Sequence, residues 1–251
     1  SALAIVTTYI SDNPAVLSLA ANKEFRKYFK NYQFVALTNL GTSFGMGFIV
    51  SAFMVAQGGL MKENLFKAVL IGNFGAVVGS IISVNLMMHY SKKYFKSIGE
   101  SEEEKEIEKF VLDTREIRRG TVFGRFLEAM LEGGKVGVDM GIAIIPGVII
   151  ICTTVLMLTN GMPEGGYTGA AYEGIGILPI IGAKLNFILK PLFGFSSPEA
   201  IAFPITALGA VGAAIGLVPQ FIKEGVIGPR EIAVFTSMGM CWSGYLSTHV
   251  A

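Results

Sequence analysis

A carboxylate lies inside an otherwise apolar stretch near the start of the chain. Asp12 is flanked by Ser11, Asn13 and Pro14 within the apolar range 2–21. A charged side chain inside a membrane segment is costly, so it is by default a hypothesis for a functional site. Proline also breaks helices and leaves backbone groups unpaired. We therefore expect Ser11, Asp12 and Asn13 to bind a hydroxyl-rich solute or a cation. A turn in which Asp12 and Asn13 only cap their own backbone is the alternative.

Small polar side chains recur in two later apolar segments. They are Thr38, Asn39, Thr42 and Ser43 in the first segment, and Thr236, Ser237, Cys241 and Ser243 in the second. Residues three and four positions apart share a helix face, so each cluster could line a binding patch. Hydrogen bonding between membrane helices is the alternative for both clusters. Thr206 and Gly209 belong to a further apolar stretch with a Gly-rich break, and we expect them to face the first cluster.

Metal and enzyme chemistry receive little support. Met238, Met240, Cys241 and His249 could form a path for a soft metal ion, but Met and Cys in an apolar helix more often serve packing. The sequence contains no phosphate-binding glycine loop, catalytic triad or zinc-ligand spacing. We expect no enzyme activity and no cofactor, apart from Na⁺ if transport is coupled to it.

The composition indicates a protein that lies in a lipid bilayer. Hydrophobic residues make up 52% of the 251 residues, charged residues make up 16%, and the mean hydropathy is +0.57. A soluble domain has about 25% charged residues. Because 20 of the 39 charged residues lie in the range 90–135, the rest cannot cover a water-exposed surface. The net charge of +1 gives no reason to expect nucleic acid as a partner. We expect a multi-pass protein of the cell (inner) membrane.

The apolar runs predict the helices. A helix needs about 20 apolar residues to span a bilayer, and four ranges meet this length: 33–57, 66–89, 136–159 and 231–251. Polar residues, Gly or Pro break three further apolar ranges: 2–21, 175–195 and 200–222. Broken backbone survives at membrane depth only when protein or a cavity covers it. We predict re-entrant hairpins at 1–21 and 196–222 and an interfacial segment at 175–195, with kinked spanning helices as the alternative.

The charged range 90–135 is predicted to be a cytoplasmic helical linker. Ser101 and Glu104 form a capping-box pattern that starts one helix. The range 121–132 is predicted to be an amphipathic helix at the membrane surface that ends at Gly133. Excess Lys and Arg in the ranges 22–32 and 90–135 place both in the cytoplasm.

The sequence contains a weak internal repeat at one fixed offset. The range 2–53 superposes on 200–251 without a gap, and both copies run from a broken apolar stretch through a charged loop to a helix with a small-polar cluster. We call two residues equivalent when this superposition pairs them, as it pairs Ala2 with Ala200.

We predict an all-α integral membrane protein with repeats at 1–89 and 136–251, each a re-entrant hairpin plus a broken spanning helix. Inverted repeats are favoured because 175–195 is a poor span; parallel repeats are the alternative. The helix that precedes the second copy and the helix that follows the first copy have no counterpart in the other copy. This difference predicts a longer protein or a second subunit that supplies the missing helices.

Three stretches of the sequence resemble known membrane proteins. Ile10–Pro14 resembles the first hairpin of concentrative nucleoside transporters, which reads Gln-Thr-Glu-Ala-Pro and whose Glu contacts the solute. Pro14 matches, Ser11 and Asp12 are chemically similar, and Ile10 and Asn13 differ. Gly133–Lys135 leading into Ile144–Gly147, together with Lys190–Ala200, resembles the broader nucleoside-recognition (Gate) proteins. That group also includes spore-maturation proteins and ferrous-iron transporters.

The resemblance implies a secondary transporter of a small polar solute, in that family a nucleoside. We expect alternating access, coupled to Na⁺ or H⁺ if it is coupled, because inverted repeats with broken helices are a recurrent transporter design. Two alternatives stay open. One is a non-transporting Gate-fold subunit that assembles with a second Gate chain or with copies of itself, and the other is a metal-ion permease.

Overall fold

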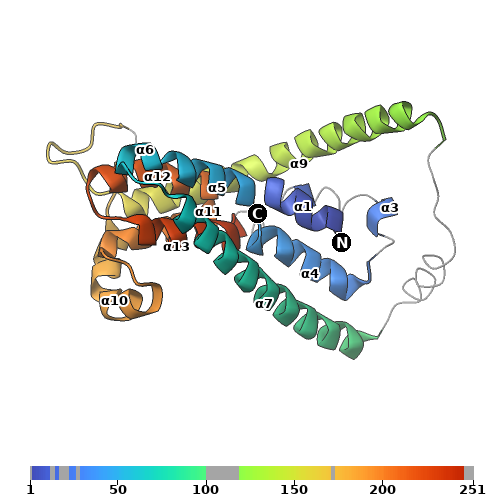
Figure 1. The fold of residues 1–251 in the computed structure, drawn as a ribbon, viewed down its shortest axis with the longest axis horizontal. Helices are drawn as coiled ribbons and strands as arrows, with labels where there is room; N and C mark the ends of the chain where they lie inside the picture. Colours follow the sequence, from blue (N-terminus) through green and yellow to red (C-terminus); the bar gives the residue numbers. More distant parts are fainter. Residues whose placement is uncertain are drawn as a thin grey trace.

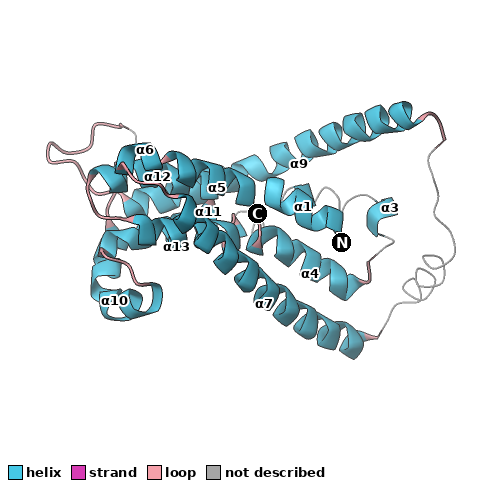
Figure 2. Cartoon of the chain, viewed as in Figure 1, coloured by secondary structure: helices cyan, strands magenta, loops and turns pink. Residues whose placement is uncertain are grey.

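The computed structural model describes residues 2–11, 15–16, 23–26, 29–99, 119–170 and 173–245. Within these ranges the chain is helical and has no strand, so the predicted all-α class is confirmed (Figure 2). Asp12, Asn13 and the helix predicted to begin at Ser101 lie outside the described residues. The helices are α1 (Ala2–Ile10), α3 (Lys23–Arg26), α4 (Asn31–Ser43), α5 (Gly47–Ala56), α6 (Gly58–Met61), α7 (Phe66–Ile98), α9 (Val122–Thr159), α10 (Ile177–Phe193), the 3₁₀ helix η1 (Pro198–Ile201), α11 (Ala202–Gly209), α12 (Val211–Lys223) and α13 (Pro229–Cys241).

Among the described residues, two helical ranges are long and apolar enough to cross a membrane: Asn31–Met61 and Phe66–Ile98. At about 1.5 Å per residue, the 33 residues of α7 extend about 50 Å. Many apolar side chains of α7 are exposed, including Phe74 at 71% and Ile71 at 66%. In water such a surface would favour association, whereas in a bilayer it is solvated by lipid.

The helices predicted over 33–57 and 231–251 are each interrupted. α4 ends at Ser43, and α5 begins only at Gly47. α13 ends at Cys241, and a turn follows through Gly244, so the expected helix from 231 onward is not continuous. The apolar stretch 200–222 is also interrupted, since Ala210 separates α11 from α12 with an extended backbone.

The surface helix predicted over 121–132 is wrong as a separate element. It forms the first part of α9, which runs without interruption from Val122 to Thr159 and contains Pro146. The side chain of Thr121 caps this helix by accepting a hydrogen bond from Gly124 N at 3.0 Å. Gly133 was expected to end the helix, but a glycine in a helix interior costs only about 1 kcal/mol. Without a competing partner for its backbone, it does not break the helix.

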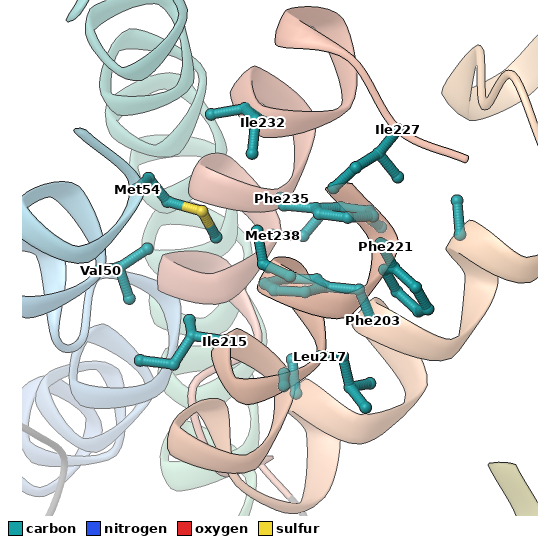
Figure 3. Packing of buried hydrophobic residues seen from close by; sticks show 14 of the residues in the cluster. Val50, Met54, Phe203, Ile215, Leu217, Phe221, Ile227, Ile232, Phe235 and Met238 are labelled. Carbon is teal, nitrogen blue, oxygen red and sulfur yellow. The ribbon is translucent and has the colours of Figure 1, made fainter. Parts of the chain in front are cut away.

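The main cluster of buried apolar side chains lies where α11 and α12 pack against α13, which in turn packs along α7 (Figure 1). Its centre is a stack of Phe203 on Phe235, with ring centroids 4.1 Å apart, and Phe195 meets the edge of Phe235 at 5.9 Å. Figure 3 shows Phe203 of α11 and Phe221 of α12 on the same side of Phe235. α7 packs most extensively against α4 and α13, so it joins the two interrupted helices.

Candidate functional site

The two interruptions have the same backbone conformation. Phe44 caps the end of α4 with φ −145° and ψ 24°, and its N–H donates to Leu40 O. Trp242 caps the end of α13 with φ −120° and ψ 23°, and its N–H donates to Met238 O. Two residues further on, Met46 and Gly244 are both left-handed, with φ 56° and 57°. The residues of each pair are equivalent in the sequence repeat.

The interruptions also bind each other directly. Gly45 N donates to Met240 O at 3.3 Å, and Ser243 N donates to Thr42 O at 3.2 Å. Thr42 is equivalent to Met240, and Gly45 is equivalent to Ser243. The two hydrogen bonds are therefore the same interaction with the partners exchanged. We call this arrangement, residues 42–46 with 240–244, the crossing.

Each half of the crossing is tied to its neighbouring apolar segment. Met46 N donates to Thr8 O at 3.2 Å and to Ser11 O at 2.8 Å, while Gly244 N donates to Ala207 O at 3.2 Å. The C-terminal ends of α1, α4, α11 and α13 therefore meet at one place. Because a helix C-terminus carries a partial negative charge, this place favours a cation or a group rich in hydrogen-bond donors.

Most of the predicted hydroxyl ligands bond to their own helices. Thr38 donates to Val35 O, Thr42 to Asn39 O and Thr236 to Ile232 O. Asn39 donates from Nδ2 to Ser83 Oγ at 2.9 Å, which links α4 to α7. For these residues the hydrogen bonds match the alternative stated above, in which small polar side chains bond within and between helices.

Two buried hydroxyl groups have no partner within the described residues. They are Ser43 Oγ and Thr206 Oγ1, in side chains that are 4% and 1% exposed. Thr8, the equivalent of Thr206 in the repeat, donates its hydroxyl to Ala4 O at 2.7 Å. A buried polar group without a partner costs about 1–3 kcal/mol, so a bound ligand at these hydroxyls would be favoured.

A groove of about 480 Å³ opens beside the crossing, between α7, α13 and the end of α10. Its polar lining residues are Ser43, Ser83, Ser237 and Cys241, and its apolar walls include Leu192, Phe193 and Trp242. None of its lining residues is charged. Gly75 and Gly79 let α7 approach closely, since a Cβ on them would lie 3.0 Å from Ser237 Oγ and 3.1 Å from Cys241 Sγ. The groove can offer hydroxyl groups and aromatic faces to a neutral polar solute.

Sequence reasoning selected some of the groove's residues and missed others. Ser43, Ser237 and Cys241 line it as candidates, Asn39 reaches it through Ser83, and Ser243 is buried at the crossing. Gly75, Gly79 and Ser83 were missed, although their spacing of four places small residues on one helix face. Leu192 and Phe193, which form the groove wall from α10, lie in the Lys190–Ala200 motif but were not selected as site residues.

The structure shows the positions of only some of the remaining candidate residues. Ser11 lies beside the first interruption, and Gly209 ends α11. His249 lies outside the described residues, and within the described ones no three His, Cys, Asp or Glu side chains gather into a metal site.

Comparison with known proteins gives no match. No family model, no curated sequence and no solved structure is similar to this chain. The resemblance to Gate proteins therefore rests on the sequence motifs alone, and the function has to be inferred from the groove and the crossing.

Proposed function

We propose that this chain is a multi-pass protein of the cell membrane that carries a small polar solute across the bilayer. The observation that carries the proposal is the crossing, where two interrupted helices exchange backbone hydrogen bonds beside an uncharged groove that is rich in hydroxyl groups. Interrupted helices at membrane depth expose backbone polar groups that a solute or ion can bind. By resemblance to Gate proteins, the solute is a nucleoside.

The proposal includes two inverted repeats. A contact that is unchanged when its partners are exchanged is what a two-fold axis produces, and the paired hydrogen bonds of the crossing have this property. α4 and α13 approach the crossing from opposite ends of the molecule (Figure 1), which supports the inverted form over the parallel one. α11 and α12 pack against each other and would form the second re-entrant hairpin.

The helix starts support the same repeat. Lys30 N donates to Gln33 Oε1 at 2.9 Å at the start of α4, and Gly228 N donates to Glu231 Oε2 at 2.9 Å at the start of α13. Donor and acceptor are again equivalent residues of the two copies. Rocking of one repeat against the other would give alternating access, and the four helix C-termini at the crossing would favour Na⁺ or a proton as the coupling ion.

Uptake into proteoliposomes tests the proposal. Radiolabelled nucleosides and neutral amino acids are the first solutes, and Ser237→Ala and Asp12→Ala should each reduce uptake at least several-fold. Ser97→Ala is the matched control, because Ser97 is exposed and bonds to Tyr94 O away from the groove. Uptake equal to empty liposomes for all solutes, or equal uptake by all variants, would contradict the proposed site.

A thiol in the groove offers a second, independent readout. Cys241 lines the groove, and the other cysteine of the sequence is Cys152. In a Cys152→Ser background, a transported solute should therefore slow the alkylation of Cys241 by N-ethylmaleimide. A solute that is taken up but does not protect Cys241 would place the binding site elsewhere.

One observation favours a subunit role as a second candidate function. The first half of α9 exposes large apolar side chains, including Phe123 at 69% and Leu131 at 76%. A Cβ on Gly133 or Gly137 would meet no atom of the described residues within 4 Å, so a partner helix could approach closely there. Co-purification of a second Gate chain, without solute uptake, would favour a non-transporting subunit.

A further inference from the structure

Glu231 is a buried carboxylate at the start of α13. Its side chain is 1% exposed, and it accepts three hydrogen bonds from neutral donors. Ser196 donates from N at 2.9 Å and from Oγ at 2.7 Å, and Gly228 N donates at 2.9 Å. Hydrogen bonds to an ionised acceptor are about twice as strong as neutral ones, so this residue makes a strong local link.

The corresponding residue of α4 makes a simpler contact. Gln33 is the equivalent of Glu231 in the repeat and accepts from Lys30 N as an ordinary helix cap. Glu231 keeps this cap through Gly228 and adds two bonds to Ser196, which lies 35 residues away in the segment between α10 and η1. At the start of α13, Glu231 therefore caps its own helix and also links α13 to the segment between α10 and η1. We call the bonds between Glu231 and Ser196 the tether.

The tether fixes one wall of the groove. Ser196 follows Gly194, which ends α10 in a left-handed conformation with φ 71°. Between them, Phe195 stacks on Phe193 at 5.5 Å and meets the edge of Phe235 at 5.9 Å. Phe193 and its neighbour Leu192 line the groove. The position of this wall therefore depends on a segment that is held by Glu231 at one end and by aromatic contacts along its length.

We propose that Glu231 is a positioning residue for transport, and that its bonds to Ser196 hold the last turn of α10 over the groove. The left-handed Gly194 supplies the hinge on which this turn swings, because glycine readily changes its backbone angles, and the Arg230 guanidinium that packs on Gly194 moves aside with it. Release of Ser196 opens the groove, and re-formation of the tether closes it around the solute. The inference rests on the proposed function, because it concerns access to that same groove.

Alkylation of Cys241 measures whether the wall has moved. In the Cys152→Ser background in proteoliposomes, Ser196→Ala should raise the rate of N-ethylmaleimide labelling about tenfold or more, the loss expected for a hydrogen bond to a charged acceptor. Ser196→Thr keeps the hydroxyl and should restore the wild-type rate. Gln33→Ala is the matched control, because it removes the corresponding cap in α4 and leaves the groove wall intact.

Transport kinetics separate positioning from general destabilisation. Ser196→Ala and Glu231→Gln should raise both KM and the maximal rate, because an open wall admits solute faster but holds it less well, whereas general destabilisation would lower the maximal rate. Wild-type labelling of Ser196→Ala, or an equal increase in Gln33→Ala, would overturn the inference. If Ser196→Ala labels faster while the unmodified protein transports nothing, the tether stands and the transport proposal fails.

Discussion

The two interruptions share their backbone but differ in almost every side chain. Met46 stands where the second interruption has Gly244, and both adopt the same left-handed φ. Ser43 corresponds to Cys241 and Gly45 to Ser243, yet the hydrogen bonds between the interruptions are reciprocal. The conformation is therefore set by the backbone partners that the interruptions give each other. The side chains are free to differ, and the differences are where distinct roles for the two halves would lie.

The largest expected effect follows from closing the space at the crossing. A Cβ on Gly45 would lie 2.6 Å from Gly41 O and 3.0 Å from the Ser243 side chain. Because Gly41 O is backbone of α4 and Ser243 belongs to the facing interruption, Gly45→Val should distort the end of α4, push the interruptions apart and lower the free energy of unfolding by about 3 kcal/mol or more. Thermal unfolding in detergent measures this. Gly216→Val is the matched control, since a Cβ there meets nothing within 4 Å; equal effects of both variants would show that the crossing is not tightly packed.

Substitutions at the two left-handed positions, Met46 and Gly244, should change stability in opposite directions. Gly244→Ala places a Cβ at φ 57° and should cost about 1–2 kcal/mol. Met46→Gly relieves the same strain at φ 56° but gives the unfolded chain more freedom, so its net effect should be smaller and of opposite sign. Shifts of the same sign in the two unfolding midpoints would mean that side-chain packing of Met46 outweighs backbone strain.

Substitutions of the two equivalent threonines of the repeat should also differ in their effect on stability. Thr8→Val removes a hydrogen bond to Ala4 O and should cost about 1 kcal/mol. Thr206→Val removes a buried hydroxyl without a partner among the described residues, so without solute or ion it should leave stability unchanged or raise it. If Thr206→Val lowered the free energy of unfolding as much as Thr8→Val does, the Thr206 hydroxyl would already be bonded in the unliganded protein.

The sequence predicted some of the positions at which helices break and missed others. The Gly-rich stretch around Gly209 was expected to interrupt the chain, and α11 ends there. Gly45 and Gly133 look alike in sequence, yet only Gly45 lies at a break. Gly45 N finds Met240 O, whereas a Cβ on Gly133 would meet nothing. A glycine lowers the cost of leaving the helix, and a tertiary partner that only the fold supplies decides the outcome.

The residues of the site, like the helix breaks, were predicted only in part. Residue type and helical spacing selected Ser43, Ser237 and Cys241, which line the groove. The same criteria selected Thr38 and Thr236, whose hydroxyls turn back to their own helices. A threonine in a helix can bond to a carbonyl three or four residues earlier, and sequence alone does not tell which rotamer is adopted.

The smallest expected effect contrasts Glu231 with a carboxylate that performs the same task in solvent. Glu173 accepts hydrogen bonds from Thr168 N and Gly169 N at 2.9 Å in the loop between α9 and α10. The Thr168 hydroxyl, helped by these amides, lowers the pKa of Glu173 from its ordinary value of 4.5. A lowered pKa stabilises the loop at pH values above about 4.5, and this stabilisation is lost as pH falls through the lower folded-state pKa.

Because the protein covers Glu173 only in part, solvent screening keeps this contribution small. Glu173→Gln should leave the unfolding midpoint unchanged and speed amide exchange only at Thr168 and Gly169, whereas Glu231→Gln should shift the midpoint measurably. Comparing each variant with the unmodified protein at pH 6 and at pH 3 tests the sign, since the difference at Thr168 should shrink at the lower pH. A difference that grows on acidification would mean that the protonated Glu173 makes the stronger contact, and that the carboxylate is not what orders the loop.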